Sequence, residues 1–176
     1  MTDVITVSID GMGGDNAPDM IVGGIELASS HADDVRYLLF GDEAQLQPLL
    51  DQHPKAKAVC EIRHTTDVVT MDDKPTAALR SGKNSSMRLA IDAIKSGEAS
   101  AVVSAGNTGA LMAMATVVLR MLPGISRPAI VTSFPTQRGD SVMLDLGANI
   151  ECDAENLVQF AVMGEVFARN ELDIEQ

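Results

Sequence analysis

The chain has 176 residues, of which 45% are hydrophobic and 22% are charged, which is typical of a globular protein. Its net charge of −12 and its 3% of aromatic residues argue against nucleic-acid binding, which depends on basic side chains and aromatic stacking. No apolar run approaches the roughly 20 residues of a membrane-spanning helix, and the first residues lack the basic region of a secretory signal. The two cysteines have no metal-ligand spacing, so we expect a reduced, cytoplasmic protein.

The chain alternates stretches that are typical of strands with stretches that are typical of helices. β-Branched and apolar runs predict strands over residues 4–10, 35–41, 57–65, 101–104, 127–134 and 140–149. Helical spacing predicts helices after Pro18, over residues 42–53, as two pieces within 74–97, and over 107–122 and 153–172. Strands separated by helices predict a three-layer α/β/α fold with a mainly parallel sheet.

Single residues add detail to these helices. Asp15 and Asn16 are candidate caps of the first helix, and Asp153 is the expected cap of the last. Pro48 is predicted to kink or shorten the second helix, because proline removes a backbone donor. The helix over 107–122 is apolar almost all round, which predicts that it is buried.

A glycine-rich loop, GMGGDNAP, directly follows the first predicted strand. It differs from a dinucleotide-binding fingerprint, because residue 16 is asparagine where the third glycine is required. The later stretch SGKNSS differs from a P-loop, since Asn84 replaces Ser or Thr and Ala77 replaces the leading glycine. We expect the glycines of the first loop to let the backbone pass close to a substrate. These glycines are Gly11, Gly13 and Gly14.

The strongest ligand-binding signal is VVSAGNTGALMA, where a predicted strand ends and a helix begins. The first N–H groups of such a helix have no intrahelical acceptor, and the helix dipole places about half a positive charge there. Open α/β sheets bind ligands at this edge, so the stretch predicts an anion site. Its candidate donors are Ser104, Gly106, Asn107 and Thr108. A tight turn with ordinary helix capping has the same pattern.

A second cluster, RSGKNSSM, lies in a locally basic segment of this acidic chain. Residues 74–95 carry five basic side chains and one acid, whereas nine acids and one base lie from residue 139 onward. Such a segment suits a small anion or an acidic protein partner, although a solvated helix face has the same pattern. The candidate anion ligands are Arg80, Lys83, Asn84, Ser85 and Ser86. We predict that Lys83, Asn84 and Asn107 are the catalytic residues.

Acidic residues lie at the ends of predicted strands and in the first loop. Carboxylates at such positions bind divalent metals, orient loop N–H groups or pair with basic side chains. We expect no bound metal. The candidate loop-organising residues are Asp10, Asp15, Asp145 and Asn149. For Asp10 and Asp15, pairing with the bases of residues 74–95 is the alternative.

Four motifs in this order, IDGMGGDNAP, RSGKNSSM, SAGNTGALM and LDLGAN, closely resemble the bacterial phosphate acyltransferase family of phospholipid synthesis (PlsX). The resemblance covers all 176 residues. Because chains of that family are about twice as long, it implies that residues 1–176 are the amino-terminal part of a single α/β catalytic domain. It also implies a fold similar to isocitrate and isopropylmalate dehydrogenases and to phosphate acetyltransferases.

The resemblance further implies an activity. Family members transfer a fatty acyl group from acyl carrier protein to inorganic phosphate without a cofactor, and they are homodimers that associate peripherally with the membrane. Direct attack of phosphate on a thioester requires an anion cradle and an oxyanion donor, which agrees with the two clusters above. We expect this half of the protein to be inactive by itself.

Two other functions stay open from the residues alone. A metal-dependent decarboxylating dehydrogenase has the same expected fold. A non-catalytic module that docks acyl carrier protein would use the same basic segment.

Overall fold

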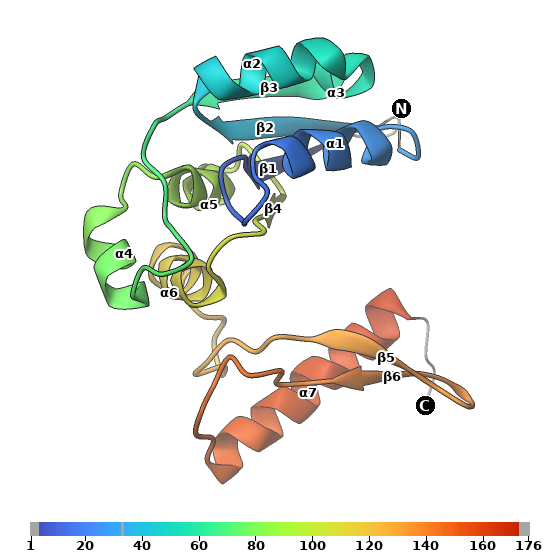
Figure 1. The fold of residues 1–176 in the computed structure, drawn as a ribbon. Helices are drawn as coiled ribbons and strands as arrows, with labels where there is room; N and C mark the ends of the chain where they lie inside the picture. The colour runs from blue at the N-terminus through green and yellow to red at the C-terminus, as the bar shows by residue number, and fades with distance from the viewer. Residues whose placement is uncertain (1–3, 33, 173–176) are drawn as a thin grey trace. The chain divides into compact units, whose positions relative to one another are not determined.

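The computed structural model describes residues 4–32 and 34–172. The chain divides into two compact units, the first ending at Leu119 and the second beginning at Arg120. The first unit contains a parallel sheet with helices, and the second contains a two-stranded sheet with one long helix (Figure 1). The chain is therefore an α/β protein, as predicted.

Four parallel strands form the sheet of the first unit. They are β1 (Ile5–Asp10), β2 (Val35–Gly41), β3 (Cys60–His64) and β4 (Ala101–Val103), in the spatial order β3-β2-β1-β4. The register pairs Asp10 of β1 with Phe40 of β2, and Ile9 with Val103 of β4. Because the strands are parallel, the loops after β1 and β4 leave the sheet at the same edge.

Helices lie on both faces of this sheet (Figure 1). The helices of the first unit are α1 (Asp19–Ala28), α2 (Glu43–Gln52), α3 (Pro54–Val59), α4 (Pro75–Ser81), α5 (Ser86–Ser96) and α6 (Thr108–Leu119). Leu39 packs with α1, α2 and α3, whereas its neighbours Leu38 and Phe40 pack with α5. Successive residues of a strand point to opposite faces, so an almost continuously apolar β2 is the expected centre of a covered sheet.

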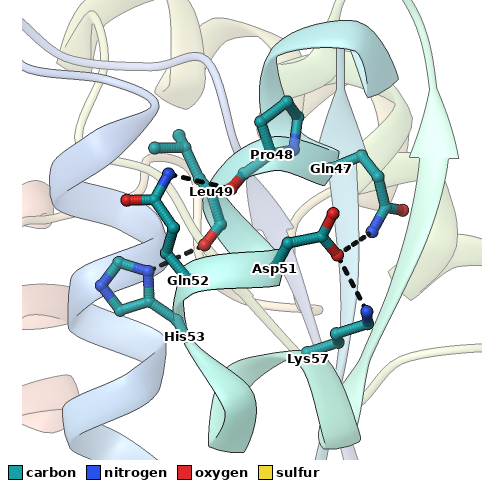
Figure 2. A network of polar contacts seen from close by, with 7 residues as sticks. All are labelled: Gln47, Pro48, Leu49, Asp51, Gln52, His53 and Lys57. Atoms are coloured by element: carbon teal, nitrogen blue, oxygen red, sulfur yellow. Dashed lines mark hydrogen bonds and ion pairs between the residues drawn. The ribbon is translucent and has the colours of Figure 1, made fainter.

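The connection from β2 to β3 differs from the prediction. The strand expected over 57–65 begins only at Cys60, because Pro54 starts the short helix α3 and Ala56 of that helix is fully buried. Pro48 does not end α2, which continues to Gln52. Figure 2 shows the polar contacts at this end of α2, where the Gln52 side chain donates to the Pro48 carbonyl. Asp51 accepts from Gln47 and from Lys57 of α3.

The predicted cap of α1 and the predicted burial of α6 were also wrong. The N-cap of α1 is Pro18, and no side chain caps this helix, so neither Asp15 nor Asn16 has that role. Helix α6 is fully buried only along one stripe, which packs with residues of α4 and α5, and the Val117 side chain is 58% exposed. An apolar composition therefore did not translate into burial on every side.

The second unit contains the hairpin of β5 (Thr132–Thr136) and β6 (Gly139–Met143), followed by α7 (Ala154–Glu171). The expected strands over 127–134 and 140–149 are shorter than predicted and pair antiparallel, because a two-residue turn joins them and Gly139 has a φ of 123°. Asp153 caps α7 in a capping box with Asn156, as expected for this position. Within residues 4–32 and 34–172, no helix combines the length and apolarity needed to cross a membrane.

Candidate functional site

Asp10 is the centre of a polar cluster at the carboxyl edge of the sheet. Its side chain is only 1% exposed, although it ends β1 and is followed by the glycine loop. One carboxylate oxygen accepts from the Ser104 hydroxyl at 2.7 Å, and the other accepts from the Ser86 hydroxyl at 2.6 Å. The Met12 N–H also donates to Asp10, at 3.3 Å. Parallel pairing of β1 with β4 explains why Ser104, the residue after β4, lies beside Asp10.

The charge of Asp10 is compensated without a basic side chain among the residues that the structure describes. A buried carboxylate needs hydrogen-bond donors, because transfer from water to the interior costs several kcal/mol per ion. Two hydroxyls and one N–H serve as these donors, and Ser86 is the first residue of α5, where the helix dipole favours negative charge. Asp10 therefore contacts the basic segment through a serine rather than through a lysine or arginine.

The glycines of the first loop allow close packing onto the turn after β4. A Cβ atom on Gly13 would overlap the Asp10 carboxylate and would lie 3.0 Å from the Gly106 nitrogen. Gly14 has a φ of 109°, in the region that favours glycine. Gly11 passes close to the backbone of β2, where its N–H donates to the Phe40 carbonyl at 2.8 Å. The glycine requirement thus has a packing cause, while closeness of these residues to a substrate stays a prediction.

The turn after β4 uses several of its own donors internally. The Ser104 hydroxyl donates to Asp10 and accepts from the Gly106 N–H at 3.1 Å. Ser86 likewise directs its proton to Asp10. Because each hydroxyl has a single proton, neither serine has a proton left to donate to a ligand, and Ser86 is also only 1% exposed.

Asn107 is 8% exposed, and both the oxygen and the nitrogen of its side-chain amide make hydrogen bonds. Its oxygen accepts from the Ala110 N–H at 3.0 Å, which caps α6. Its nitrogen lies within 3.2 Å of three carbonyl oxygens of the preceding loop, those of Thr70, Met71 and Asp73. Asn107 therefore fixes the loop of residues 70–73 at the start of α6, a role that no local sequence pattern reveals. Its contact with substrate stays a prediction.

The start of α6 presents the polar groups that are open to a ligand. Thr108 is exposed, and the N–H groups of Thr108 and Gly109 have no hydrogen-bond acceptor among the described residues. The α4 helix packs beside α6, and a Cβ atom on Gly109 would lie 2.8 Å from the Pro75 side chain. The neighbouring Lys74 is consequently close to the positive end of the α6 dipole.

The predicted basic residues differ in their availability. Lys74, Arg80 and Lys83 are exposed, and none of them has a carboxylate partner within 4.0 Å in the described parts of the chain. Arg88, by contrast, pairs with Asp92 at 3.1 Å. Within the basic segment, the cations without such a partner among the described residues are Lys74 at the N-cap of α4, Arg80 in α4, Lys83 between α4 and α5, and Lys95 in the last turn of α5.

The remaining residues of RSGKNSSM have different positions. The Ser85 side chain is fully buried, accepts from the Arg88 N–H and donates to the Gly82 carbonyl at 2.7 Å, so it caps α5. Asn84 is exposed, and its backbone carbonyl accepts from the Thr65 hydroxyl at 2.6 Å, while its side chain has no hydrogen-bond partner among the described residues. The Asn84 side chain is thus available beside Lys83.

Asp145 and Asn149 lie in the second unit. Asp145 accepts from the N–H of Ile130 at 2.9 Å, from the N–H of Ala148 at 3.2 Å, and from Asn149. Burial raises the pKa of Asp145, but the hydrogen bonds outweigh this, and the pKa lies below its ordinary value of 3.8. The Asn149 side chain also donates to the Pro128 carbonyl at 2.8 Å. These two residues join the segment before β5 to the loop after β6. Asp15 is exposed in the first unit.

Comparison with known proteins assigns the chain to a family. The family described as "Fatty acid synthesis protein" matches residues 5–176. A phosphate acyltransferase of Rhodospirillum centenum is 60% identical over 174 residues, covering 99% of this chain and 49% of the relative. A phosphate acyltransferase of Rhodospirillum rubrum is 58% identical over 176 residues, covering 100% and 50%. The chain thus spans about half the length of these curated relatives.

Comparison with a solved structure supports the α/β fold. The EutD phosphotransacetylase from Staphylococcus aureus matches with a TM-score of 0.66 and 17% identity, covering 93% of this chain and 52% of that one. At this identity the match shows the fold alone, and it confirms the predicted likeness to phosphate acetyltransferases. The sequence match along nearly the whole chain carries the family assignment, and the chain belongs to the PlsX family of bacterial phosphate acyltransferases, of which it corresponds to the amino-terminal half.

Proposed function

We propose that the full-length protein containing this chain transfers a fatty acyl group from acyl carrier protein to inorganic phosphate, forming acyl phosphate for phospholipid synthesis. A phosphate oxygen attacks the thioester carbonyl, and the C–S bond then breaks. The carrier leaves as a thiolate, which takes up a proton. The observation that supports this best is that, among the described residues, Arg80 and Lys83 are exposed without a carboxylate partner and the first N–H groups of α6 have no acceptor.

The proposed phosphate ligands are those that the fold leaves available. Lys83 and Arg80 supply charge, while the Thr108 hydroxyl and the first N–H groups of α6 supply directed donors. The Asn84 side chain lies next to Lys83 in sequence and is exposed, which suits it to the oxyanion that develops on the thioester carbonyl. Residues 74–95 also suit the acidic carrier protein, because complementary charge steers association.

The domain organisation, oligomeric state and location of the complete protein are part of the same proposal. Residues 1–176 are the amino-terminal part of one catalytic domain, and the other half of the protein completes it. The complete protein works in the cytoplasm as a homodimer that associates with the membrane surface. We expect the isolated half to be inactive, because it lacks every site, acyl-chain or dimer-interface residue that lies in the other half.

One assay of the full-length protein tests the reaction. Palmitoyl-carrier protein is incubated with increasing phosphate, and free carrier thiol and hydroxylamine-reactive acyl phosphate are both measured. We expect equal amounts of the two products, with a rate that saturates in phosphate. Carrier binding without thiol release would instead indicate a docking module, and thiol release that is independent of phosphate would indicate a thioesterase.

A further inference from the structure

Asp10 connects three parts of the first unit that are far apart in sequence. Its hydroxyl donors Ser86 and Ser104 lie 76 and 94 residues further along the chain, and its N–H donor lies in the glycine loop. The carboxylate is 1% exposed, and no basic side chain compensates it among the described residues. Burial of a carboxylate that is held by hydroxyls and an N–H is costly, so the geometry of these donors is closely tied to Asp10.

The donors of Asp10 determine where two helices begin. Ser86 is the first residue of α5 and follows the segment that contains Lys83. Ser104 accepts from the Gly106 N–H, and α6 begins two residues later at Thr108. A single carboxylate therefore fixes both helix starts, and the proposed phosphate ligands lie at these starts.

The chemistry of the contacts requires a carboxylate at this position. An ionised carboxylate only accepts hydrogen bonds, which matches two hydroxyls and one N–H that all donate. An asparagine has an NH₂ group in place of one oxygen, and this group would face a hydroxyl proton. Asp10→Asn therefore keeps the size of the side chain but forces at least one serine to turn away.

We propose that Asp10 is a positioning residue for the phosphate site, acting through Ser86 and Ser104 on the starts of α5 and α6. The proposal rests on the function proposed above. Asp10 does not contact phosphate, because it is buried behind the two hydroxyls and like charges repel. Its effect is on the geometry of Lys83 and Thr108.

The test compares Asp10→Asn with Asp19→Asn in the full-length protein. Asp19 is an exposed aspartate at the start of α1 and is the matched control. We expect Asp10→Asn to raise the KM for phosphate about tenfold or more. This is the effect of weakening one hydrogen bond between phosphate and a donor at the displaced helix starts. The KM for the acyl donor should change less than about twofold, and Asp19→Asn should resemble the wild type.

A purely structural role would lower the active fraction or Tm and leave the phosphate KM of the folded enzyme unchanged, and that result would overturn the proposal. If Asp10→Asn does not fold, Ser104→Ala serves instead, because it keeps the carboxylate and removes one donor. Ser104→Ala should raise the phosphate KM, and Ser104→Thr, which restores the hydroxyl, should recover it. An unchanged KM in Ser104→Ala contradicts the proposal.

Measuring phosphate binding directly distinguishes a failure of the positioning role from a failure of the proposed function. If the wild type transfers acyl groups and Asp10→Asn has the wild-type phosphate KM, only the positioning role fails. If the wild type transfers none, the proposed function fails, and calorimetric titration with inorganic phosphate still measures the site. Binding weakened about tenfold in Asp10→Asn then supports positioning, and equal or absent binding in both proteins overturns it.

Discussion

Asp10 ends β1 and Asp145 lies two residues after β6, and each accepts several hydrogen bonds, yet their donors come from different distances along the chain. The hydroxyl donors of Asp10 lie 76 and 94 residues away, whereas the donors of Asp145 lie at most 15 residues away. Asp10 is buried and joins separate elements, and Asp145 is half-buried and joins the two segments that flank one hairpin. The same side chain thus stabilises tertiary structure in one unit and local structure in the other.

Removing each carboxylate in turn should give the largest difference in the free energy of unfolding. Asp10→Ala leaves two hydroxyls and an N–H without their acceptor in the interior, so we expect a loss of about 3–5 kcal/mol in the free energy of unfolding. Asp145→Ala should cost about 1–2 kcal/mol, because water can replace it at a half-buried loop. Urea unfolding of the full-length variants measures both values. Equal losses would show that the distance of the donors along the chain does not matter.

A methyl group at Gly13 tests how tightly the loops around Asp10 pack. Gly13→Ala places a Cβ against the Asp10 carboxylate and the Gly106 nitrogen, so we expect a loss of about 2–3 kcal/mol. Gly23→Ala is the control, since it lies in α1 with open space around its Cβ and should stabilise by up to about 1 kcal/mol. Thermal unfolding of both variants gives the comparison, and a neutral Gly13→Ala would mean that the loop moves without cost.

Asn107 has two structural roles that substitutions can separate. Asn107→Ser keeps an oxygen that can cap α6 but loses the NH₂ group that faces the carbonyls of the 70–73 loop. Asn107→Ala loses both, and should be less stable than Asn107→Ser by the value of an N-cap, about 1 kcal/mol. Hydrogen exchange should show faster exchange in residues 70–73 for both variants. Unchanged exchange there would contradict the anchoring role.

The smallest expected effect is the pH dependence that Asp145 contributes. Its pKa in the folded state lies below the ordinary value of 3.8, so its stabilising contribution is present above that value and is lost as pH falls through the folded pKa. Asp145→Asn should therefore reduce the acid sensitivity of unfolding below about pH 4 and have little effect on its slope at neutral pH. Unfolding curves from pH 2 to 7 check this, and an unchanged acid limb would contradict the assignment.

The sequence predicted the architecture well because periodic patterns report local structure and burial. The parallel sheet, its helices and the cap at Asp153 follow from patterns within a few residues. The start of β3 was misplaced, because residues Pro54–Val59 form a short helix that buries only Ala56, a pattern that a strand start shares. The burial of α6 was overestimated, since composition does not state how many neighbours a helix has.

The candidate site was predictable in location but not in contacts. Parallel pairing of β1 and β4 brings the glycine loop and the SAGNTGA turn to one edge, as the sequence indicated. Which donors face which acceptors depends on tertiary distances that no local pattern contains. The Asn107 contact with the 70–73 loop and the Ser86 contact with Asp10 are of this kind.

The phosphate KM of Lys83→Gln, compared with that of Lys95→Gln in the full-length enzyme, tests the proposed site most directly. Both lysines are exposed, but Lys83 lies just before α5, whereas Lys95 lies in its last turn. We expect Lys83→Gln to raise the phosphate KM about tenfold or more, as loss of a charge-assisted contact requires, and Lys95→Gln to leave it within about twofold. Equal phosphate KM values in the two variants would contradict a phosphate site at the start of α5 and α6.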